Sequence, residues 1–351
     1  MKNFIKMLVY LLVFVAIVFG GFLLYMSLDD YSPEYKTVII ENNNPTIIPD
    51  SAELNLLSWN IGYCGLNKEM DFFYSGGKQV YPEKDVVFAN IQGVKAQVKS
   101  VQPIDFMLFQ EVDKYSLRSH FTNQVDTLSN MFSDYFSTYA KNYDVAFVPM
   151  PLSKPMGSVN SGLLTLSKYT PISSVRYSYE GNFIWPKALF MLDRCFMVNR
   201  YKLSNGKQLL MINTHNSAYD TGGLRKAQMI QIREFVKKEY EQGNYIIVGG
   251  DWNQCAPGFK DDFSKDKMDF DSKLDIEDGF MPDNWTWFYD NREPTNRRNR
   301  IDYQQGKTLT TVIDFFLLSP NIQSINIRNI SNGFTYSDHQ PVKASVKLTA
   351  K

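Results

Sequence analysis

A chain of 351 residues, 44% of them hydrophobic, has enough apolar material to bury one large core or two smaller ones. Lysine plus arginine and aspartate plus glutamate both number 37, so the formal net charge is zero, whereas a dedicated nucleic-acid binder is usually more basic. The three cysteines have no C-x-x-C spacing, which excludes a disulfide scaffold and a zinc ribbon.

The N-terminal segment predicts a membrane anchor. Residues 7–28 contain no charged side chain and lie between Lys6 and Asp29. As a helix rising ~1.5 Å per residue they would reach about 33 Å, enough to cross the hydrocarbon core of a bilayer. A cleaved signal peptide is the alternative, but its apolar region usually spans only about 7–15 residues and ends at an A-x-A-like site, which this segment lacks. We therefore expect a single-pass transmembrane helix over residues 7–28.

The residues on either side of this helix predict orientation and domain organisation. Lys2 and Lys6 favour a cytoplasmic N-terminus over residues 1–6, because positively charged flanks stay inside. The rest of the chain is then extracytoplasmic, tethered to the cytoplasmic membrane. Residues 29–51 are expected to form a linker, because prolines and an Asn-Asn-Asn-Pro run interrupt any regular element. The globular domain is expected over residues 52–351.

Many strands with a few helices are predicted in this domain, which indicates an α/β domain or a helix-flanked β-sandwich. The clearest helix carries apolar residues at three- and four-residue spacing from Met229 to Tyr240 and is followed by Gly243. Another helix is expected over residues 90–100. The predicted strands cover residues 54–60, 104–111, 162–166, 208–215, 246–248, 311–318 and 342–348.

The stretch around Asp251 carries the strongest local signal. Residues 246–248 are β-branched and apolar, as expected of a buried strand, and two glycines are expected to end it. Asp251 and Asn253 follow, and side chains two apart in an extended backbone point to the same face. A carboxylate and an amide would then project together. A plain turn is the alternative, because glycine, aspartate and asparagine also favour turns.

The same arrangement recurs, because polar side chains stand at or near the ends of most predicted strands. Loops that leave one edge of a sheet converge on one site. Carboxylate and amide oxygens without sulfur suit a hard cation, Mg²⁺ or Mn²⁺. Each residue alone has a structural alternative as a cap, a turn or a satisfied core group, so the recurrence carries the prediction. The set is Asn60, Glu111, His215, Asp251, Asn253, Asp314, Asp338 and His339.

Six short runs, in order, resemble the motifs of the endonuclease/exonuclease/phosphatase superfamily. The resemblance covers roughly residues 52–348. It implies an α/β (α+β) four-layer sandwich, in which two mostly antiparallel sheets pack face to face with helices outside. It also implies metal-dependent hydrolysis of a phosphoester. The runs cover residues 56–60, 109–111, 213–215, 250–253, 313–315 and 337–339.

The resemblance implies a metal role for three residues. Glu111 would be the principal ligand of Mg²⁺ or Mn²⁺, with Asn60 and Asp338 near the metal. It also implies that Asp251 orients or deprotonates the attacking water, while Asn253 holds that water or a phosphate oxygen.

The remaining roles concern the charge that develops on phosphorus. By the resemblance, His339 stabilises this charge and is held by Asp314. His215 is a second phosphate contact or the acid that protonates the leaving group. These groups also suit in-line attack on phosphorus, which needs an oriented water and donors where charge builds up.

Two loops are candidate parts of a pocket. Residues 71–78 are rich in aromatics and glycine and could line its edge, or could pack in the core. Four arginines, Arg292, Arg297, Arg298 and Arg300, could bind a second phosphate or a lipid head group, or could form a solvated basic loop.

The sequence therefore predicts a membrane-anchored phosphoesterase that uses Mg²⁺ or Mn²⁺. Its substrates are expected to be phosphodiesters or phosphomonoesters of small or lipid-linked molecules, including phospholipid head groups, and the protein is expected to be a monomer. A nuclease acting on external nucleic acid is the less favoured enzyme. A catalytically silent binding module on the same fold is the alternative from another class.

Overall fold

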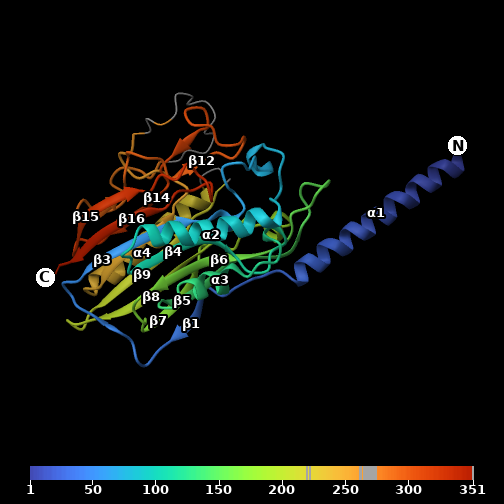
Figure 1. Ribbon diagram of the computed structural model, residues 1–351. Coiled ribbons are helices and arrows are strands. Elements are labelled where there is room, and N and C mark those ends of the chain that lie inside the picture. Colours follow the sequence, from blue (N-terminus) through green and yellow to red (C-terminus); the bar gives the residue numbers. More distant parts are fainter. Residues whose placement is uncertain (219, 221–222, 261–262, 264–274, 350–351) are drawn as a thin grey trace.

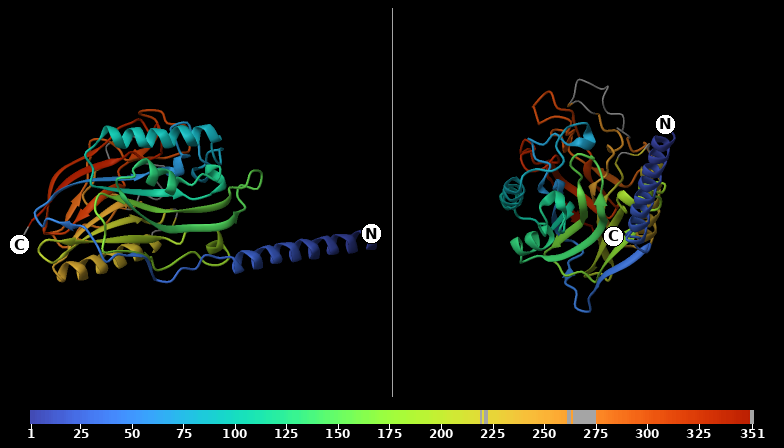
Figure 2. Two further views of the ribbon diagram at one scale, coloured as in Figure 1. Left: turned by 60° about the horizontal axis from the view of Figure 1, so that its bottom comes forward. Right: turned by 90° about the vertical axis from the view of Figure 1, so that its right-hand side faces the viewer.

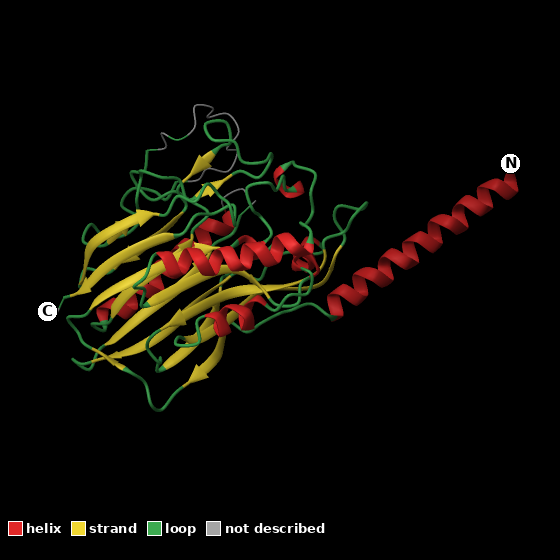
Figure 3. Cartoon of the chain, in the orientation of Figure 1, coloured by secondary structure: helices red, strands yellow, loops and turns green. Residues whose placement is uncertain are grey.

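The computed structural model describes residues 1–218, 220, 223–260, 263 and 275–349. Two β-sheets lie face to face, helices cover their outer faces, and one long helix projects from one end (Figure 1). The layers are easiest to follow with strands and helices coloured separately (Figure 3). The predicted four-layer sandwich is confirmed.

The first sheet has eight strands in the described chain, and all its pairs are antiparallel except β9 with β10 and β2 with β8. Its order is β1, β7, β8, β9, β10, β14 and β11, with β2 beside β8. The bounds are β1 Lys36–Glu41, β2 Ile47–Ile48, β7 Ser173–Ser178, β8 Cys195–Leu203, β9 Gln208–His215, β10 Tyr245–Asp251, β11 Thr286–Phe288 and β14 Asp314–Leu318.

The second sheet has six strands in the order β15, β16, β3, β4, β6 and β5, with β3 and β4 parallel. A separate pair, β12 and β13, lies near the site described below. The bounds are β3 Glu53–Asn60, β4 Phe106–Asp113, β5 Phe136–Val148, β6 Gly157–Ser167, β12 Asn296–Arg297, β13 Thr310–Thr311, β15 Ile322–Asn329 and β16 Val342–Leu348.

Apolar side chains fill the space between the sheets and under the helices. Leu56 and Phe106 of one sheet pack with Met211 and Ile247 of the other to form the central core. The helix α4 (Gly223–Glu241) covers the outer face of the first sheet through Met229, Ile232 and Val236. The helices α2 (Lys84–Ser100) and α3 (Gln124–Met131) cover the second sheet. The apolar periodicity that predicts α4 therefore marks its buried face.

The predicted linker is wrong for part of its length. Within residues 29–51, β1 pairs with β7 and β2 pairs with β8, so this segment extends the first sheet. The reason is the β-branched run at Val38, Ile39 and Ile40, which favours an extended strand despite the nearby prolines.

Two predicted strand ends also differ. The strand β10 continues through Gly249 and Gly250 to Asp251 instead of ending at the glycines. A Cβ at Gly250 would meet Thr214 O of β9 at 1.9 Å, and its φ of +152° is one that other residues rarely adopt. Glycine is needed there for close strand packing. The strand predicted over residues 311–318 is interrupted, so Asp314 is the first residue of β14 and not an interior one.

The N-terminal helix α1 (Lys2–Leu28) is long and apolar enough to cross a membrane. It extends away from the sandwich, at the end where β5 and β6 are joined (Figure 2). The three cysteines are buried and form no disulfide.

Candidate active site

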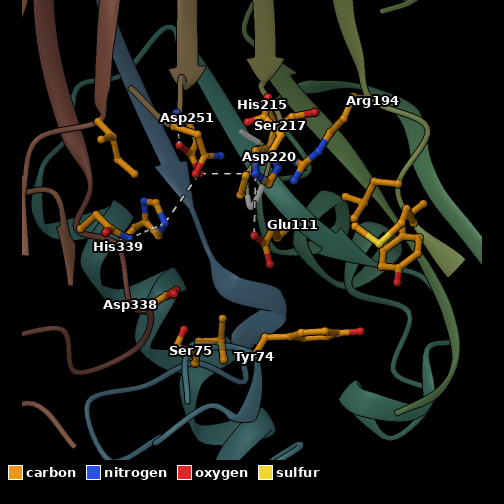
Figure 4. A pocket seen from close by; sticks show the side chains of 18 of the residues that line it. Tyr74, Ser75, Glu111, Arg194, His215, Ser217, Asp220, Asp251, Asp338 and His339 are labelled. Atoms are coloured by element: carbon orange, nitrogen blue, oxygen red, sulfur yellow. Dashed lines mark hydrogen bonds and ion pairs between the residues drawn. The ribbon is translucent and has the colours of Figure 1, made fainter. Parts of the chain in front are cut away.

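A cavity of about 540 Å³ opens at one end of the sandwich, where strands of both sheets end. Polar residues from these strand ends form its floor (Figure 4). The term floor residues is used below for Asn60, Glu111, His215, Asp251, Asp314 and His339.

Strand register brings three floor residues together. Asp251 at the end of β10 is directly opposite His215 of β9 on one side and Asp314 of β14 on the other. Side chains opposite one another on neighbouring strands project from the same face of a sheet. His215 Nε2 lies 3.4 Å from Asp251 Oδ2 and 3.9 Å from Glu111 Oε1. His215, Asp251 and Asp314, which are far apart in sequence, thus lie side by side at one edge of the sheet.

Asn60 connects the two sheets at this point. Its Nδ2 donates to Asp251 Oδ2 (3.0 Å) and to Glu111 Oε1 (3.2 Å), while its Oδ1 accepts from Gly62 N (2.9 Å). The side chain is fully buried. One amide therefore fixes two carboxylates and leaves one lone pair of Oδ1 free for another partner.

Glu111 reaches the cavity because β4 has a bulge. The register of β4 with β6 shifts between Phe109 and Val112, and Glu111 has a φ of +53°. A bulge of this kind redirects a side chain, and unusual backbone conformations concentrate at functional sites. Burial raises the pKa of Glu111, and the nearby Asp338 carboxylate raises it further.

Asp338 is held on the opposite wall. Asn299 Nδ2 donates to Asp338 Oδ2 at 2.7 Å, and Ser337 Oγ lies 3.3 Å from Asp338 Oδ1. A Cβ at Gly62 would come within 2.8 Å of this Oδ1, so glycine leaves the carboxylate room. The placement of Asp338 thus depends on Asn299, which follows β12, and on Gly62, which follows β3.

His339 carries a positive charge in this environment. Burial opposes protonation, but Asp314 and Asp251 raise the pKa of His339 well above its usual value. Its Nδ1 lies 2.8 Å from Asp314 Oδ2, and its Nε2 lies 3.6 Å from Asp251 Oδ2. Asn296 Nδ2 lies 2.9 Å from His339 Nε2. Because an amide nitrogen only donates, a protonated Nε2 pairs with Asn296 when the amide is turned so that its oxygen faces the ring.

His215 is in the opposite state. Burial and the Arg194 guanidinium lower the pKa of His215 well below its usual value, so the ring is neutral. With Nε2 facing carboxylates, the proton is on Nε2, and Nδ1 has no hydrogen-bond partner among the described residues. Two histidines in different protonation states can perform different tasks in one site.

Asp251 titrates near neutral pH. Burial raises the pKa of Asp251 to about 6, and the charge of His339 and the amide of Asn60 counteract the increase. Above that pH the carboxylate is ionised and can accept a proton or orient a water. The main-chain N–H of Asn253 donates to Asp251 Oδ1 (2.9 Å), and Asn253 Nδ2 donates to Asn216 O (2.9 Å). These two bonds fix the turn after β10, in which Asn253 has a φ of +50°.

Two sets of residues could hold a cation. The ligand atoms of Asp251, Asp314 and His339 lie within 4.8 Å of one another. A doubly protonated His339 cannot bind a metal, and its own charge already balances these acids, so this set does not fit. Glu111 and Asp338 face the cavity. Their two carboxylates repel each other, so a cation bound between them would be stabilised, and Asn60 Oδ1 adds a third oxygen. These oxygens fit a hard divalent cation.

Arg194 is a site residue that the sequence analysis missed. It lies just before β8 and points toward His215 (Figure 4). Burial lowers the pKa of Arg194, while Glu111 and Asp251 act in the opposite direction. Its Nη1 is buried and has no hydrogen-bond partner among the described residues. A donor without a partner, directed into a polar cavity, is suited to bind an anion. Its segment carries no strand-end signal, so only its position reveals it.

The early loop predicted to line the pocket does so, through Phe72, Tyr74 and Ser75. The arginine-rich loop divides. Arg297 is buried and donates to main-chain oxygens of Asn67 and Met70, so its role is structural.

The other three arginines of that loop differ in position. Arg292 is exposed and paired with Asp290, outside the cavity. Arg298 lines the cavity, and Arg300 is exposed beside Gly76. Of the four arginines predicted to bind a second phosphate, Arg297 and Arg298 line the cavity, and Arg297 is engaged by main-chain oxygens.

Comparison with known proteins supports the family indicated by the motifs. The sequence pattern of the Endonuclease/Exonuclease/phosphatase family matches residues 57–339. No curated protein matched the chain in sequence.

Solved structures with this fold are similar along most of the chain. An endonuclease/exonuclease/phosphatase family protein from Bacteroides thetaiotaomicron is 14% identical, with a TM-score of 0.53 over 88% of this chain and 100% of that one. The protein from Beutenbergia cavernae is 13% identical, with a TM-score of 0.53 over 85% and 72%. D. rerio TDP2, complexed with single strand DNA product, is 14% identical, with a TM-score of 0.51 over 84% and 99%. At these identities the likeness shows the fold alone.

Proposed function

The chain belongs to the Endonuclease/Exonuclease/phosphatase family, and from that premise we propose that it is a membrane-anchored, Mg²⁺-dependent phosphoesterase. Members of this family are hydrolases of phosphoester bonds. The observation that carries the proposal is the position of Asp251 between two histidines, with His215 Nε2 at 3.4 Å and His339 Nε2 at 3.6 Å from Asp251 Oδ2. A carboxylate that can orient a water, beside imidazoles that can donate, suits hydrolysis at phosphorus.

In this mechanism Asp251 holds the attacking water. Its carboxylate is ionised above about pH 6, and Asn253 N fixes its orientation. The Asn253 side chain, on the same turn, contacts the water or a phosphate oxygen. Water attack in line with the leaving group then needs only positioning and charge stabilisation, because little covalent chemistry falls to the protein.

Cationic and donor groups stabilise the charge that develops on the phosphoryl oxygens. His339, held by Asp314, donates through Nε2, and Arg194 offers its free Nη1 from the other side of the cavity. His215, which carries its proton on Nε2, donates to a phosphate oxygen or protonates the leaving group. Such preorganised donors contribute about 3–4 kcal/mol each to transition-state stabilisation.

Glu111 and Asp338 would hold the divalent cation, with Asn60 Oδ1 beside them. When bound, a divalent cation there would act as a Lewis acid that offsets negative charge on the phosphoester. Mg²⁺ is preferred because the donors are oxygens, and Mn²⁺ would fit the same set.

For location we propose that α1 spans the cytoplasmic membrane with residues 1–6 inside and the catalytic domain outside. The length and hydropathy of α1 and the lysines at its start support this arrangement. The protein is proposed to act as a monomer, because the floor residues all come from one chain.

The test is a hydrolysis assay with the full chain in phospholipid nanodiscs. With Mg²⁺ we expect turnover of bis-p-nitrophenyl phosphate or p-nitrophenyl phosphate, abolished by EDTA and restored by Mg²⁺ or Mn²⁺. No turnover of any phosphoester with either metal would indicate a silent binding module. Preferential cleavage of DNA would instead favour a nuclease, the candidate that the DNA product in the TDP2 structure supports.

A further inference from the structure

Five exposed apolar side chains stand beside the C-terminal end of α1. Leu152 is 81% exposed, Ile184 is 87% exposed and Trp185 is 58% exposed. They belong to two segments, the end of β5 with its connection to β6, and the loop before β8. The name apolar rim is used below for Phe147, Met150, Leu152, Ile184 and Trp185.

The end of α1 holds both segments of the apolar rim together. Phe22 contacts the Phe147 ring edge-on at 6.3 Å and stacks on Phe190 at 6.0 Å. Met26 is buried in a cluster with Val148 and Met156, which begin and end the connection between β5 and β6. The Trp185 indole N–H donates to Ser27 Oγ at 3.2 Å. The helix is therefore packed on the domain, and the rim surrounds the place where it leaves.

The length of the free part of α1 fixes where the bilayer begins. Residues 2–21 are exposed, whereas Phe22, Leu23 and Met26 contact the domain. Of these, residues 7–21 follow the charged Lys6, and 15 residues at ~1.5 Å each reach about 22 Å, less than the ~30 Å of the hydrocarbon core. If α1 spans the membrane from residue 7, the outer surface of the core therefore lies past Phe22, at the part of α1 that packs on the domain beside the apolar rim.

The rim has the composition of a membrane-interface surface. It joins aliphatic tips to an indole whose polar end is satisfied, and tryptophan favours the headgroup region. Two lysines flank it over aromatic rings, with Lys187 Nζ 3.8 Å from the Phe183 ring centre and Lys154 Nζ 4.1 Å from that of Tyr81. Lysines with apolar stems suit this boundary.

The cavity opens at the same end of the sandwich. Phe183, Met191 and Leu192, from the loop that carries Ile184 and Trp185, line its wall, as does Met156. The left view in Figure 2 shows the β5–β6 connection and α1 extending from this end. An apolar wall therefore connects the catalytic floor to the rim.

We propose that the apolar rim docks on the bilayer that α1 spans, so that the cavity opens onto the membrane surface. The substrate class that follows is a membrane-resident amphiphile, whose phosphoester head enters the cavity while its chains remain in the lipid. This inference rests on the proposed anchoring and phosphoesterase activity.

The test measures label depth in the full chain, reconstituted in phosphatidylcholine nanodiscs. Single cysteines carrying a fluorescent label replace Leu152, Ile184, Leu12 in the middle of α1, and Ile325, which is 49% exposed on β15. The native cysteines are buried, which favours selective labelling. Labels at 152 and 184 should be quenched at least about twofold more by lipids with doxyl groups near the headgroup than the label at 325.

Each label separates one failure from another. Leu12→Cys reports the anchor, so a label there that aqueous iodide quenches would overturn the anchoring itself. Lipid quenching at 12 without quenching at 152 and 184 would overturn the docking surface while leaving the anchor and the activity intact. Protection of 152 and 184 from both lipid and iodide would indicate a protein partner and would also overturn the proposal.

Discussion

The floor and the apolar rim of the cavity are built in opposite ways. Floor residues come from strands of both sheets near their ends and from the loop before β16, are mostly buried, and hydrogen-bond to one another. Rim residues come from connections and the end of β5 and are exposed, and two of them, Phe147 and Trp185, contact α1. In the proposed mechanism the floor residues therefore carry out hydrolysis, and the rim residues place the cavity at the membrane that holds the substrate. Catalytic precision depends on register, whereas access depends on loops that the scaffold tolerates in many lengths.

This difference makes separable predictions. Changes on the floor should lower the rate on every substrate with the fold intact. Changes on the rim should affect only substrates that reside in a membrane. A variant that violates this division would show that the two regions are not independent.

The largest effect is expected for Glu111→Gln. The substitution keeps shape and volume but removes the charge that binds a hard cation. Turnover of soluble and membrane substrates should fall by orders of magnitude, and added Mg²⁺ or Mn²⁺ should restore only part of it. Glu69→Gln, at an exposed glutamate, is the control and should retain activity. Near wild-type turnover in folded Glu111→Gln would place the metal elsewhere.

His339→Ala should have the next largest effect. A lost transition-state contact of about 3–4 kcal/mol predicts a 10²–10³-fold fall in kcat, with metal affinity nearly unchanged. The measurement combines kinetics with Mn²⁺ binding followed by calorimetry. His120→Ala is the matched control, because His120 contacts Pro82 O away from the cavity. An equal loss in both variants would attribute the effect to stability.

Arg194→Met tests the cavity residue that only the structure revealed. Loss of one charge-assisted contact to the phosphate predicts a fall of about 10–100-fold in kcat/KM. Because Arg194 lowers the pKa of His215, the variant should also raise that pKa, which NMR titration of the His215 ring would detect. Arg233→Met on the surface of α4 should change neither quantity.

The pH dependence should follow Asp251. Its pKa is raised to about 6, so the carboxylate is protonated below that pH and ionised above it. Since the ionised form is required, the rate should be constant above about pH 6 and fall by up to tenfold per unit below it. Bound metal would favour the ionised form of Asp251, so the acidic limb of the pH–rate profile would move to lower pH. A rate that rises as pH falls through 6 would contradict the role of Asp251.

The smallest effect belongs to the rim. Leu152→Glu combined with Ile184→Glu should lower turnover of a nanodisc-embedded phospholipid by about 3–10-fold, since two charges are expelled from the interface. Turnover of p-nitrophenyl esters should not change. Ile325→Glu, which adds one such charge away from the rim, is the control and should affect neither assay. Equal losses of turnover on soluble and embedded substrates would show that the rim and the floor do not act independently.

The sequence by itself determined the fold class and most of the floor. Apolar runs predicted strands such as β9 and β16 with their observed bounds, because alternation and β-branching depend on local burial. Polar residues after these runs predicted one site, because strand ends of a layered fold share an edge. Spaced apolar residues predicted α4 for the same local reason.

Only the tertiary structure decided how the residues meet. Which strand lies beside β10 puts Asp251 between His215 and Asp314, and register is set by contacts between distant segments. Pairing with β7 turned the predicted linker into a strand, and close approach to Thr214 required Gly250 to continue β10. Arg194 has no local pattern at all. Its function depends on a desolvated cavity, and desolvation is a property of the packed molecule rather than of the sequence around it.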